Sequence, residues 1–329
     1  KVKFIMEKTF PLLHKKQKNK KQKMRAEGFL TWRQSIVRYW QLYLLVLPVV
    51  AYFIIFKYWP MYGVQIAFRD FSPSKGFFGS EWVGLEYFKQ FFSSFSFTVI
   101  LKNTLLLSVT LLVFSFPAPI ILALLINEIQ NRHYKKVLQT VTYAPHFLST
   151  VVMVSMLVAF VNTDTGIINT CLKQMGFEAI DFMSDPKRFR PMYIITDIWK
   201  GAGWGSIIYL SSLSSINPAL YEAAKIDGAS RFKQMLHITL PALAPTIVLM
   251  LIMDCGRIMN VGFEKVLLMQ NSLNLDVSEV ISTYVYKMGI GQMKFSYSTA
   301  IDLFNSVINL IMLLSVNKIS KKISGSGMF

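Results

Sequence analysis

Two pairs of charged residues stand inside long apolar runs of this sequence. Asp197 and Lys200 are three residues apart, and Asp254 and Arg257 repeat that spacing. A charged side chain in an apolar segment is costly, so such residues are candidates for function. On a helix, residues three apart share a face, so each pair can form an ion pair. Two roles remain open: the residues line a polar pathway, or they only satisfy each other inside a helix bundle.

The first charge pair is followed by the glycine-rich stretch GAGWG at residues 201–205. Inside a membrane, a helix can be locally unwound where its backbone lines a cavity. We therefore expect a loosened helix at Gly203, where Trp204 can stack on the apolar C–H face of a sugar ring. Alternatively, the glycines only allow two helices to approach closely. His146 and Thr150, spaced one helical turn apart, can bind hydroxyl groups or serve only in packing.

The sequence holds no recognisable catalytic constellation. No segment matches the phosphate-binding pattern G-x-x-x-x-G-K-[ST]. No paired carboxylates and no Ser/His/Asp or Cys/His set converge on one region. The four histidines lack metal-ligand spacing. Cys171 and Cys255 fall in different predicted segments, so we expect no disulfide between them. We predict a chain that is not an enzyme and that has no catalytic residue, bound metal or cofactor of its own.

Composition places the chain in a membrane. It has 329 residues, of which 53% are hydrophobic, and its mean hydropathy is +0.41. The net charge of +17 is uneven, because residues 1–38 hold twelve Lys and Arg against two Glu. Positive charge gathers on the cytoplasmic side of membrane proteins. The basic excess is therefore interpreted as a topogenic tail, and nucleic acid is not an expected partner.

The apolar runs predict an all-α, polytopic membrane protein with both termini inside. A bilayer-spanning helix needs about 20 apolar residues. Pro60 is expected to end the first span, and Pro117 and Pro119 to kink the second. We divide the chain into a basic cytoplasmic tail (1–38), a six-span domain (39–322) and a short tail (323–329). The six predicted spans are 41–58, 99–127, 140–161, 191–215, 241–262 and 297–317.

Three connecting segments carry further expectations. Residues 61–97 form an aromatic-rich outer loop that either packs onto the bundle or contacts a partner outside the membrane. The outer segment 263–296 can contain a short interfacial helix. In the sixth span, Asp302, Asn305 and Asn309 follow helical spacing. This polar stripe faces either the pathway or a partner subunit.

The polar loop 216–240 predicts a helix–turn–helix at the membrane surface. Asn217 can cap a helix, and Pro218 suits its first position. Gly228 is placed to end that helix, because glycine takes the left-handed conformation of a C-terminal cap. A second helix runs from about Ser230, and Pro241 marks its junction with the fifth span. From physics alone, a plain connecting loop is an equally good interpretation.

The same loop resembles a known motif. Glu222-Ala223-Ala224, then Gly228 after three residues, then Ile238-x-Leu240-Pro241 after nine more, is similar to the EAA loop of ABC-importer permeases. The resemblance implies a coupling helix that docks on a cytoplasmic ATPase. The residues that it assigns to coupling are Glu222, Ala223, Ala224, Asp227, Gly228 and Pro241.

The resemblance extends over about Tyr39 to Lys322. Segments such as YWPMYGVQIAFRDF, GWGSIIYLSSL and HITLPALAPTIV resemble the carbohydrate-uptake, maltose-type permeases, and within them the LplB-like group. That family implies a type I importer permease fold, with a sugar pathway lined by the third, fourth and fifth spans. The candidate pathway residues are then His146, Thr150, Asp197, Lys200, Gly203, Trp204, Asp254 and Arg257.

The resemblance also implies partners. We expect an oligosaccharide importer of a bacterial plasma membrane, with a second, similar permease, a cytoplasmic ATPase pair that binds ATP and Mg²⁺, and an extracellular solute-binding protein. Three alternatives remain: the same machinery with a peptide, amino acid or glycerol phosphate as cargo, a membrane scaffold that carries nothing, and a membrane enzyme. The loop motif alone does not choose the cargo.

Overall fold

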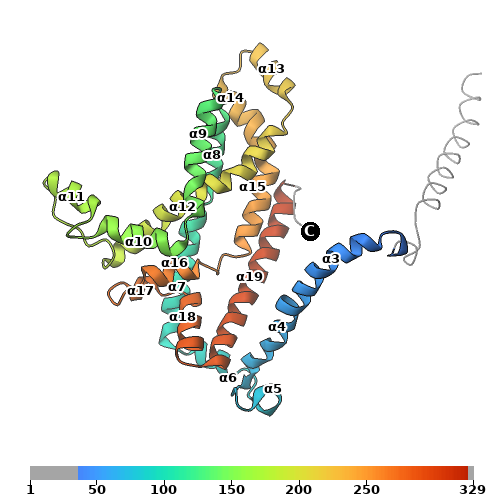
Figure 1. Cartoon of the computed structure of the whole chain (residues 1–329), viewed down its shortest axis with the longest axis vertical. Coiled ribbons are helices and arrows are strands. Elements are labelled where there is room, and N and C mark those ends of the chain that lie inside the picture. The colour runs from blue at the N-terminus through green and yellow to red at the C-terminus, as the bar shows by residue number, and fades with distance from the viewer. Residues whose placement is uncertain (1–35, 325–329) are drawn as a thin grey trace, which may run out of the picture. The chain divides into compact units, whose positions relative to one another are not determined.

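The computed structural model describes residues 36–324, with side chains described through residue 322. Nearly all of the predicted basic tail and the last residues of the chain therefore lie outside the described residues. Two compact units divide the chain, with the boundary between Val64 and Gln65. Each is described by itself below (Figure 1).

Within the described residues, the first unit is one long helical run. It consists of α3 (Trp40–Phe53), the π-turn η1 (Ile54–Tyr58), α4 (Trp59–Met61) and the start of the 3₁₀ segment η2 (Tyr62–Phe68). The stretch Trp40–Phe68 is long and apolar enough to cross a membrane. The prediction that Pro60 ends this helix is wrong, because the run continues through it. In a regular α-helix the proline ring clashes with the carbonyl group four residues earlier. A π-turn directly before the proline moves that carbonyl group and so relieves the clash.

The second unit opens with a small β-ribbon and two short helices. Strands β1 (Arg69–Asp70) and β2 (Glu81–Trp82) pair antiparallel and flank α5 (Gly76–Gly79), and α6 (Glu86–Phe92) follows. Next come α7 (Phe95–Phe114) and α8 (Pro117–Asn127), which meet at the predicted proline break. The aromatic-rich segment packs on the unit as expected at Phe91, which is 1% exposed, whereas Phe78 is 85% exposed.

The third predicted span is not one straight helix. It is built from α9 (Arg132–Tyr143), the 3₁₀ turn η3 (Ala144–Phe147) and α10 (Thr150–Val161), and the two halves are bent by 100°. Leu148 and Ser149 are extended, and the Ser149 hydroxyl accepts from Val152 N to start α10. A side-chain cap at this point favours a new helix start over continuation.

Helix α12 (Pro186–Ser214) is the centre of the second unit. It is continuous for 29 residues and packs most extensively on α8, with further contacts to α9, α15 and α17. The expectation of unwound backbone at 201–205 is therefore wrong. Gly203 instead allows close approach, because a Cβ there would lie 1.9 Å from the Thr142 carbonyl oxygen of α9. The smaller helix α11 (Ile167–Gln174) lies before α12 in the chain.

The coupling segment and the fifth span form one helical path. Helix α13 (Pro218–Ile226) is followed by α14 (Arg231–Gln234), the π-turn η4 (Met235–Thr239) and α15 (Leu240–Cys255). Pro241 thus lies inside a helical run rather than at a junction, again just after a π-turn. The run Arg231–Cys255 has the length and apolarity of a membrane span, but it starts earlier and ends earlier than the predicted 241–262.

The remainder of the second unit, after α15, consists of three short helices, a π-turn and one long helix. It comprises α16 (Phe263–Met269), α17 (Leu275–Ser278), α18 (Ile281–Tyr286), the π-turn η5 (Lys287–Gly291) and the 30-residue α19 (Phe295–Ser324). The short helix expected here is α18, and its Ile281 is fully buried in a cluster with Phe91 and Ile301. Its place at a membrane interface stays a prediction. Figure 1 shows α13 and α14 at one end of this unit and α6 and α18 at the other.

The fold is a helical membrane-type architecture with fewer apolar spans than the predicted six. Within residues 36–324, four helices are long and apolar enough to cross a membrane, or five if the bent pair counts as one span. The four are Trp40–Phe68, Phe95–Asn127, Arg231–Cys255 and Phe295–Lys322. The fourth predicted span falls on α12, which is not among these helices, and the six-span count stays a prediction. The predicted inside location of both termini stays a prediction.

Candidate functional site

The start of α13 is determined by local hydrogen bonding, as the sequence predicted. The Asn217 side chain accepts a hydrogen bond of 3.0 Å from Ala219 N, and Pro218 holds the first helical position. This cap satisfies one of the backbone N–H groups that a helix start leaves free.

The end of α13 is a glycine cap. Gly228 has φ +74°. The amide of Gly228 donates to Lys225 O at 3.1 Å, and the amide of Ala229 donates to Ala224 O at 2.9 Å. These two bonds form a Schellman motif, which requires a left-handed residue at this position. The chain then reverses into α14, where Ser230 supplies the next cap.

Two side-chain hydrogen bonds tie the turn to the path of the fifth span. The hydroxyl groups of Tyr221 and Thr239 lie 3.0 Å apart, and Gln234 Nε2 donates to Ala229 O at 2.8 Å. Thr239 is only 2% exposed. The Tyr221–Thr239 contact therefore joins α13 to a buried residue of η4.

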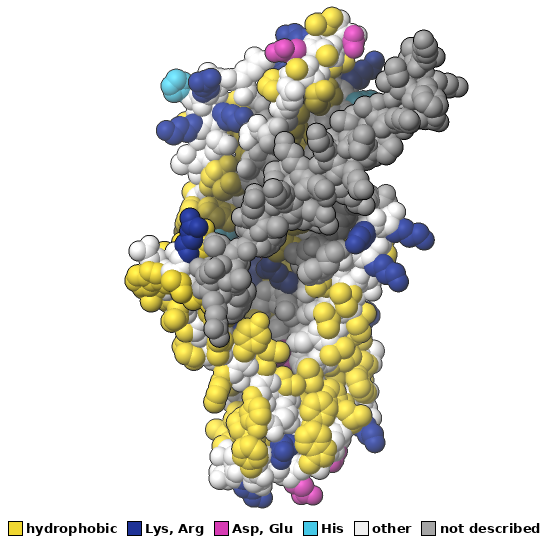
Figure 2. Space-filling model, turned by 90° about the vertical axis from the view of Figure 1, so that its right-hand side faces the viewer, with side chains coloured by type: hydrophobic (Ala, Val, Ile, Leu, Met, Phe, Trp, Pro, Cys, Tyr) yellow, Lys and Arg dark blue, Asp and Glu magenta, His cyan; other side chains and the backbone are white. Residues whose placement is uncertain are grey.

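The outer surface of this helix–turn–helix combines apolar and charged side chains. Glu222, Ala223 and Asp227 are exposed, and Ala224 is half-buried. Figure 2 shows acidic, basic and hydrophobic side chains together at the tip that α13 forms. Its large exposed apolar side chains are Leu220, Ile226, Phe232 and Leu236, and Ile226 is 87% exposed. Apolar side chains grouped and rimmed by charge are typical of protein-docking surfaces.

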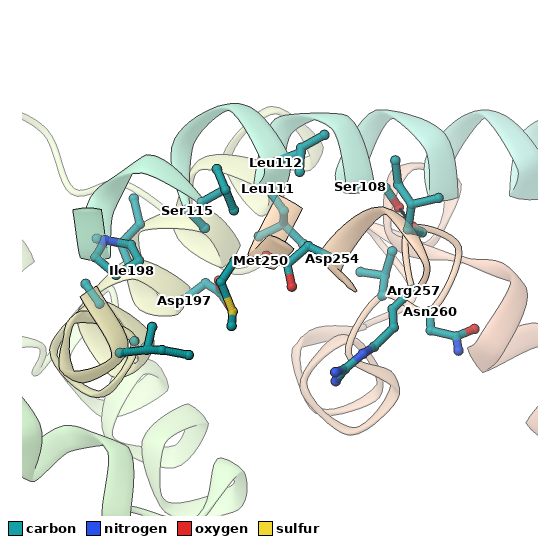
Figure 3. Close-up of a pocket in the computed structure, with 18 of the residues that line it drawn as sticks. Ser108, Leu111, Leu112, Ser115, Asp197, Ile198, Met250, Asp254, Arg257 and Asn260 are labelled. Atoms are coloured by element: carbon teal, nitrogen blue, oxygen red, sulfur yellow. Dashed lines mark hydrogen bonds between the residues drawn. The ribbon is translucent and has the colours of Figure 1, made fainter. Parts of the chain in front are cut away.

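A second candidate site is a cavity of about 420 Å³ in the same unit. It lies between the α7–α8 joint, α12, the end of α15 and the turn after α15. Its polar or charged lining residues are Ser108, Ser115, Asp197, Tyr209, Asp254, Arg257 and Asn260. Figure 3 shows Asp197, Asp254 and Arg257 reaching it from different segments. A cavity of this size with a few polar groups can hold a small polar ligand.

Asp197 forms its ion pair with a residue that the sequence did not single out. Lys265 Nζ lies 3.6 Å from Asp197 Oδ1, donates to Tyr193 O at 2.7 Å and stands 4.0 Å over the Tyr193 ring. Lys265 is 7% exposed. The expected pairing of Asp197 with Lys200 is therefore wrong. Lys200 instead donates to Thr150 Oγ1 at 3.1 Å.

Asp254 and Arg257 do not share a helical face. Helix α15 ends at Cys255, and Arg257 lies in the turn that follows. Both are exposed and line the cavity. Within residues 36–324, no side-chain hydrogen bond or ion pair links the two, so the predicted pair is wrong. Their charged groups are left available to a ligand in the cavity.

Five of the predicted pathway residues lie outside the wall of this cavity. They are His146, Thr150, Lys200, Gly203 and Trp204. The Trp204 ring stacks on His146, with centroids 4.5 Å apart and planes 2° from parallel, and the Phe147 ring meets it edge-on. One face of the indole is thus occupied by the chain itself. A direct role for these residues in cargo binding stays a prediction.

Two residues of the polar stripe in the sixth span contact a residue that lines the cavity, but they do not line it themselves. Asn305 and Asn309 both donate to Asn260 Oδ1, at 2.7 and 3.2 Å, and Asn309 Oδ1 accepts from Met259 N. Asn260 lines the cavity, whereas Asp302 is exposed. Two asparagines of α19 therefore hold one polar lining residue in place. Among the residues that the structure describes, no group of three or more His, Cys, Asp or Glu can hold a metal ion.

Comparison with known proteins agrees with these features. Residues 119–325 match the family described as binding-protein-dependent transport system inner membrane component. Protein LplB of Bacillus subtilis (strain 168) is 49% identical over 300 residues, which cover 91% of this chain and 94% of that protein. The polygalacturonan/rhamnogalacturonan transport system permease protein YteP of the same organism is 46% identical, covering 88% of this chain and 90% of that protein.

A solved structure shows the same fold. A chain in the crystal structure of a bacterial alginate ABC transporter, in complex with an alginate pentasaccharide-bound periplasmic protein, superimposes with a TM-score of 0.83 at 40% identity. The match covers 90% of this chain and 99% of that chain. This chain therefore belongs to the inner-membrane permease family of binding-protein-dependent ABC importers.

Proposed function

We propose that this chain is the membrane permease of an ATP-driven importer of oligosaccharides. The observation that carries the proposal is the α13–α14 turn, which is capped at both ends, tied to η4 and covered with exposed apolar side chains. Such a surface suits docking of a separate protein. The relatives named for polygalacturonan/rhamnogalacturonan and alginate transport support a saccharide cargo.

In this proposal the α13–α14 turn is the site where ATPase movement enters the membrane domain. Ile226 and Phe232 insert into the ATPase surface, while Glu222 and Asp227 add charged contacts. The Tyr221–Thr239 hydroxyl contact passes the displacement to η4 and hence to α15. Helix α15 ends beside Asp254 and Arg257 of the cavity. One helix thus connects the docking surface to the proposed cargo pathway, as alternating access requires.

The remaining parts of the proposal concern partners and topology. A second, similar permease would complete the pathway, a pair of cytoplasmic ATPases would bind ATP and Mg²⁺, and an extracellular protein would deliver the sugar. The alginate complex with its periplasmic protein supports the last of these. The loop 216–240, the tail 1–38 and the tail 323–329 would then face the cytoplasm of a bacterium, with the domain 39–322 in its plasma membrane.

The test is uptake by the source cells with and without this gene, using labelled oligosaccharides, peptides and amino acids. Selective loss of uptake of one glycan class is expected. Complementation by the wild-type gene, but not by a variant with Ile226→Asp and Phe232→Asp at equal membrane abundance, would tie that loss to the docking surface. Selective loss of peptide or amino-acid uptake would contradict the assignment of a saccharide as cargo, but it would not contradict the coupling role of the α13–α14 turn.

A further inference from the structure

A second cavity lies at the end of the same unit that is remote from α13. Its volume is about 480 Å³, and it is an open cavity lined by residues of β1, α6, α18, η5 and the start of α19. Figure 1 shows α6 and α18 together at that end. The lining residues with polar side chains are Asp70, Tyr87, Gln90, Ser94, Tyr284, Lys294, Ser296 and Tyr297. No part of the proposed coupling machinery contributes to it.

Three of its polar groups are unused. Asp70 Oδ1 accepts a hydrogen bond of 2.7 Å from the Tyr87 hydroxyl. In the described part of the chain, no hydrogen bond or ion pair engages Asp70 Oδ2, the Gln90 amide or the Lys294 ammonium group. All three residues are exposed, so a carboxylate acceptor and two kinds of N–H donor are open to a ligand at the wall of one cavity. Pockets of this kind bind ligands through a few convergent polar groups.

The Tyr87 hydroxyl is protonated and donates its hydrogen bond to Asp70. Burial, together with the hydrogen bond to Asp70, raises the pKa of Tyr87 to about 12. The tyrosine therefore stays protonated and keeps donating to Asp70 at any physiological pH. This hydrogen bond engages Asp70 Oδ1 and leaves Asp70 Oδ2 as the carboxylate oxygen that can accept from a ligand.

The floor of the cavity is aromatic. Tyr284 and Tyr297 are 8% and 7% exposed, and their hydroxyl groups lie 3.4 Å apart. Phe71 and Phe295 meet edge-to-face, with ring centroids 6.3 Å apart, and Phe71 N donates to Ser296 Oγ at 2.9 Å. Phe71 and Phe295 both line the cavity and supply apolar surface beside the free polar groups.

The mixture of groups selects the ligand class. Asp70 disfavours a simple anion, Lys294 disfavours a simple cation, and the unused donors and acceptor disfavour a purely apolar ligand. A sugar ring combines hydroxyl groups that donate and accept with an apolar C–H face. Two neighbouring hydroxyls can donate to Asp70, while Lys294 and Gln90 donate to sugar oxygens and a ring face rests on Phe71 or Phe295.

We propose that this cavity is a saccharide-binding site at the outer mouth of the permease, which holds one sugar ring of the cargo before it enters the pathway. The placement at the outer side rests on the proposed function, since it follows from α13 facing the cytoplasm. The site is separate from the cavity lined by Asp197 and Asp254, and the two share no lining residue.

The test uses the complete importer in lipid nanodiscs, with Cys171 and Cys255 replaced by serine. Gln90→Cys is introduced into the cavity wall, and Lys89→Cys into its neighbour on α6, which does not line the cavity. Labelling by a charged, membrane-impermeant methanethiosulfonate is timed with and without tetrasaccharides of galacturonate, rhamnogalacturonan and arabinose. A transported tetrasaccharide should slow labelling of the Gln90→Cys variant and leave the labelling rate of the Lys89→Cys variant unchanged.

A second substitution tests the carboxylate. Asp70→Asn in the Gln90→Cys background should raise the half-protecting tetrasaccharide concentration about tenfold, the loss expected for one hydrogen bond to a charged group. Glu86→Gln, an exposed acid of the same α6 that lies outside the cavity wall, should leave it unchanged. Equal protection in both variants would overturn the role of Asp70.

The outcomes separate this proposal from the importer proposal. Uptake of a tetrasaccharide without any protection of the Gln90→Cys variant would overturn the outer site and leave the importer function standing. Protection that needs only the sugar-free binding protein would overturn the saccharide assignment and identify a protein-docking pocket. Protection by a tetrasaccharide in a complex that transports none would support the site and reject the importer.

Discussion

Lys265 and Asp197 form an ion pair of 3.6 Å between α16 and α12, at the edge of the cavity that both α15 and α12 line. Lys265 is almost completely buried, whereas the Asp197 side chain is 41% exposed. The lysine also donates to the Tyr193 carbonyl. The pair therefore fixes α16 to the centre of the unit and holds one carboxylate at the cavity wall.

Replacing Lys265 by methionine should destabilise the permease. The change removes the ion-pair partner of Asp197 and the hydrogen bond from Lys265 to the Tyr193 carbonyl, which Thr196 Oγ1 still donates to at 3.1 Å. The expected cost is about 2 kcal/mol, below that of a fully buried pair because Asp197 is partly exposed. Thermal unfolding of the purified complex measures it. Glu264→Gln, an exposed neighbour on α16, is the matched control.

A double variant checks that the effect comes from the pair. Asp197→Asn combined with Lys265→Met should recover part of the lost stability, because no unpaired carboxylate remains. Additive losses in the double variant would show that Lys265 acts through Tyr193 alone.

The contact between Tyr221 and Thr239 should matter for coupling more than for folding. Tyr221→Phe and Thr239→Val each remove one hydroxyl, at a cost of about 1 kcal/mol. We expect lower sugar-stimulated ATP hydrolysis at unchanged membrane abundance. Tyr134→Phe, an exposed tyrosine on α9, is the control. If the loss of sugar-stimulated ATP hydrolysis in the Tyr221→Phe/Thr239→Val double variant equals the sum of the two single losses, the two hydroxyls do not act together.

Gly228 should resist substitution because of its backbone conformation rather than lack of space. No atom lies within 4 Å of a Cβ built there, but its φ is +74°. Gly228→Ala is expected to cost about 1 kcal/mol in the α13 cap, and Gly228→Asn less, since asparagine tolerates this region. Gly228→Val should uncouple ATP hydrolysis from uptake. The measurement is the ratio of the two rates, and Gly291→Ala, which has open space and no positive φ, is the control.

Gly203 should resist substitution for the opposite reason. A Cβ there would lie 1.9 Å from the Thr142 carbonyl oxygen, so α9 and α12 must separate. Gly203→Ala is expected to cost about 1–3 kcal/mol, the usual range for overpacking. The apparent unfolding temperature in detergent is the readout. Gly201→Ala, half a turn away with no atom within 4 Å, should be near neutral, and equal losses in both would contradict the contact.

The sequence by itself determined the features that depend on a few neighbouring residues. Asn217, Pro218 and Gly228 specify α13 and its turn because their hydrogen bonds and backbone angles are satisfied within the same segment. The break at Pro117 and the long apolar runs follow from equally local physics. The loop motif, with its Glu222 and Gly228 spacing, was enough to indicate the family.

Only the tertiary structure decided which distant groups meet. Asp197 had a suitable partner in Lys200 one turn away, yet packing of α16 on α12 brings Lys265 to it. Likewise His146 covers Trp204 because the chain bends after η3, and π-turns carry the helices through Pro60 and Pro241. Charge and hydrophobicity show that a side chain needs a partner, but the partner is chosen by geometry between segments far apart in the chain.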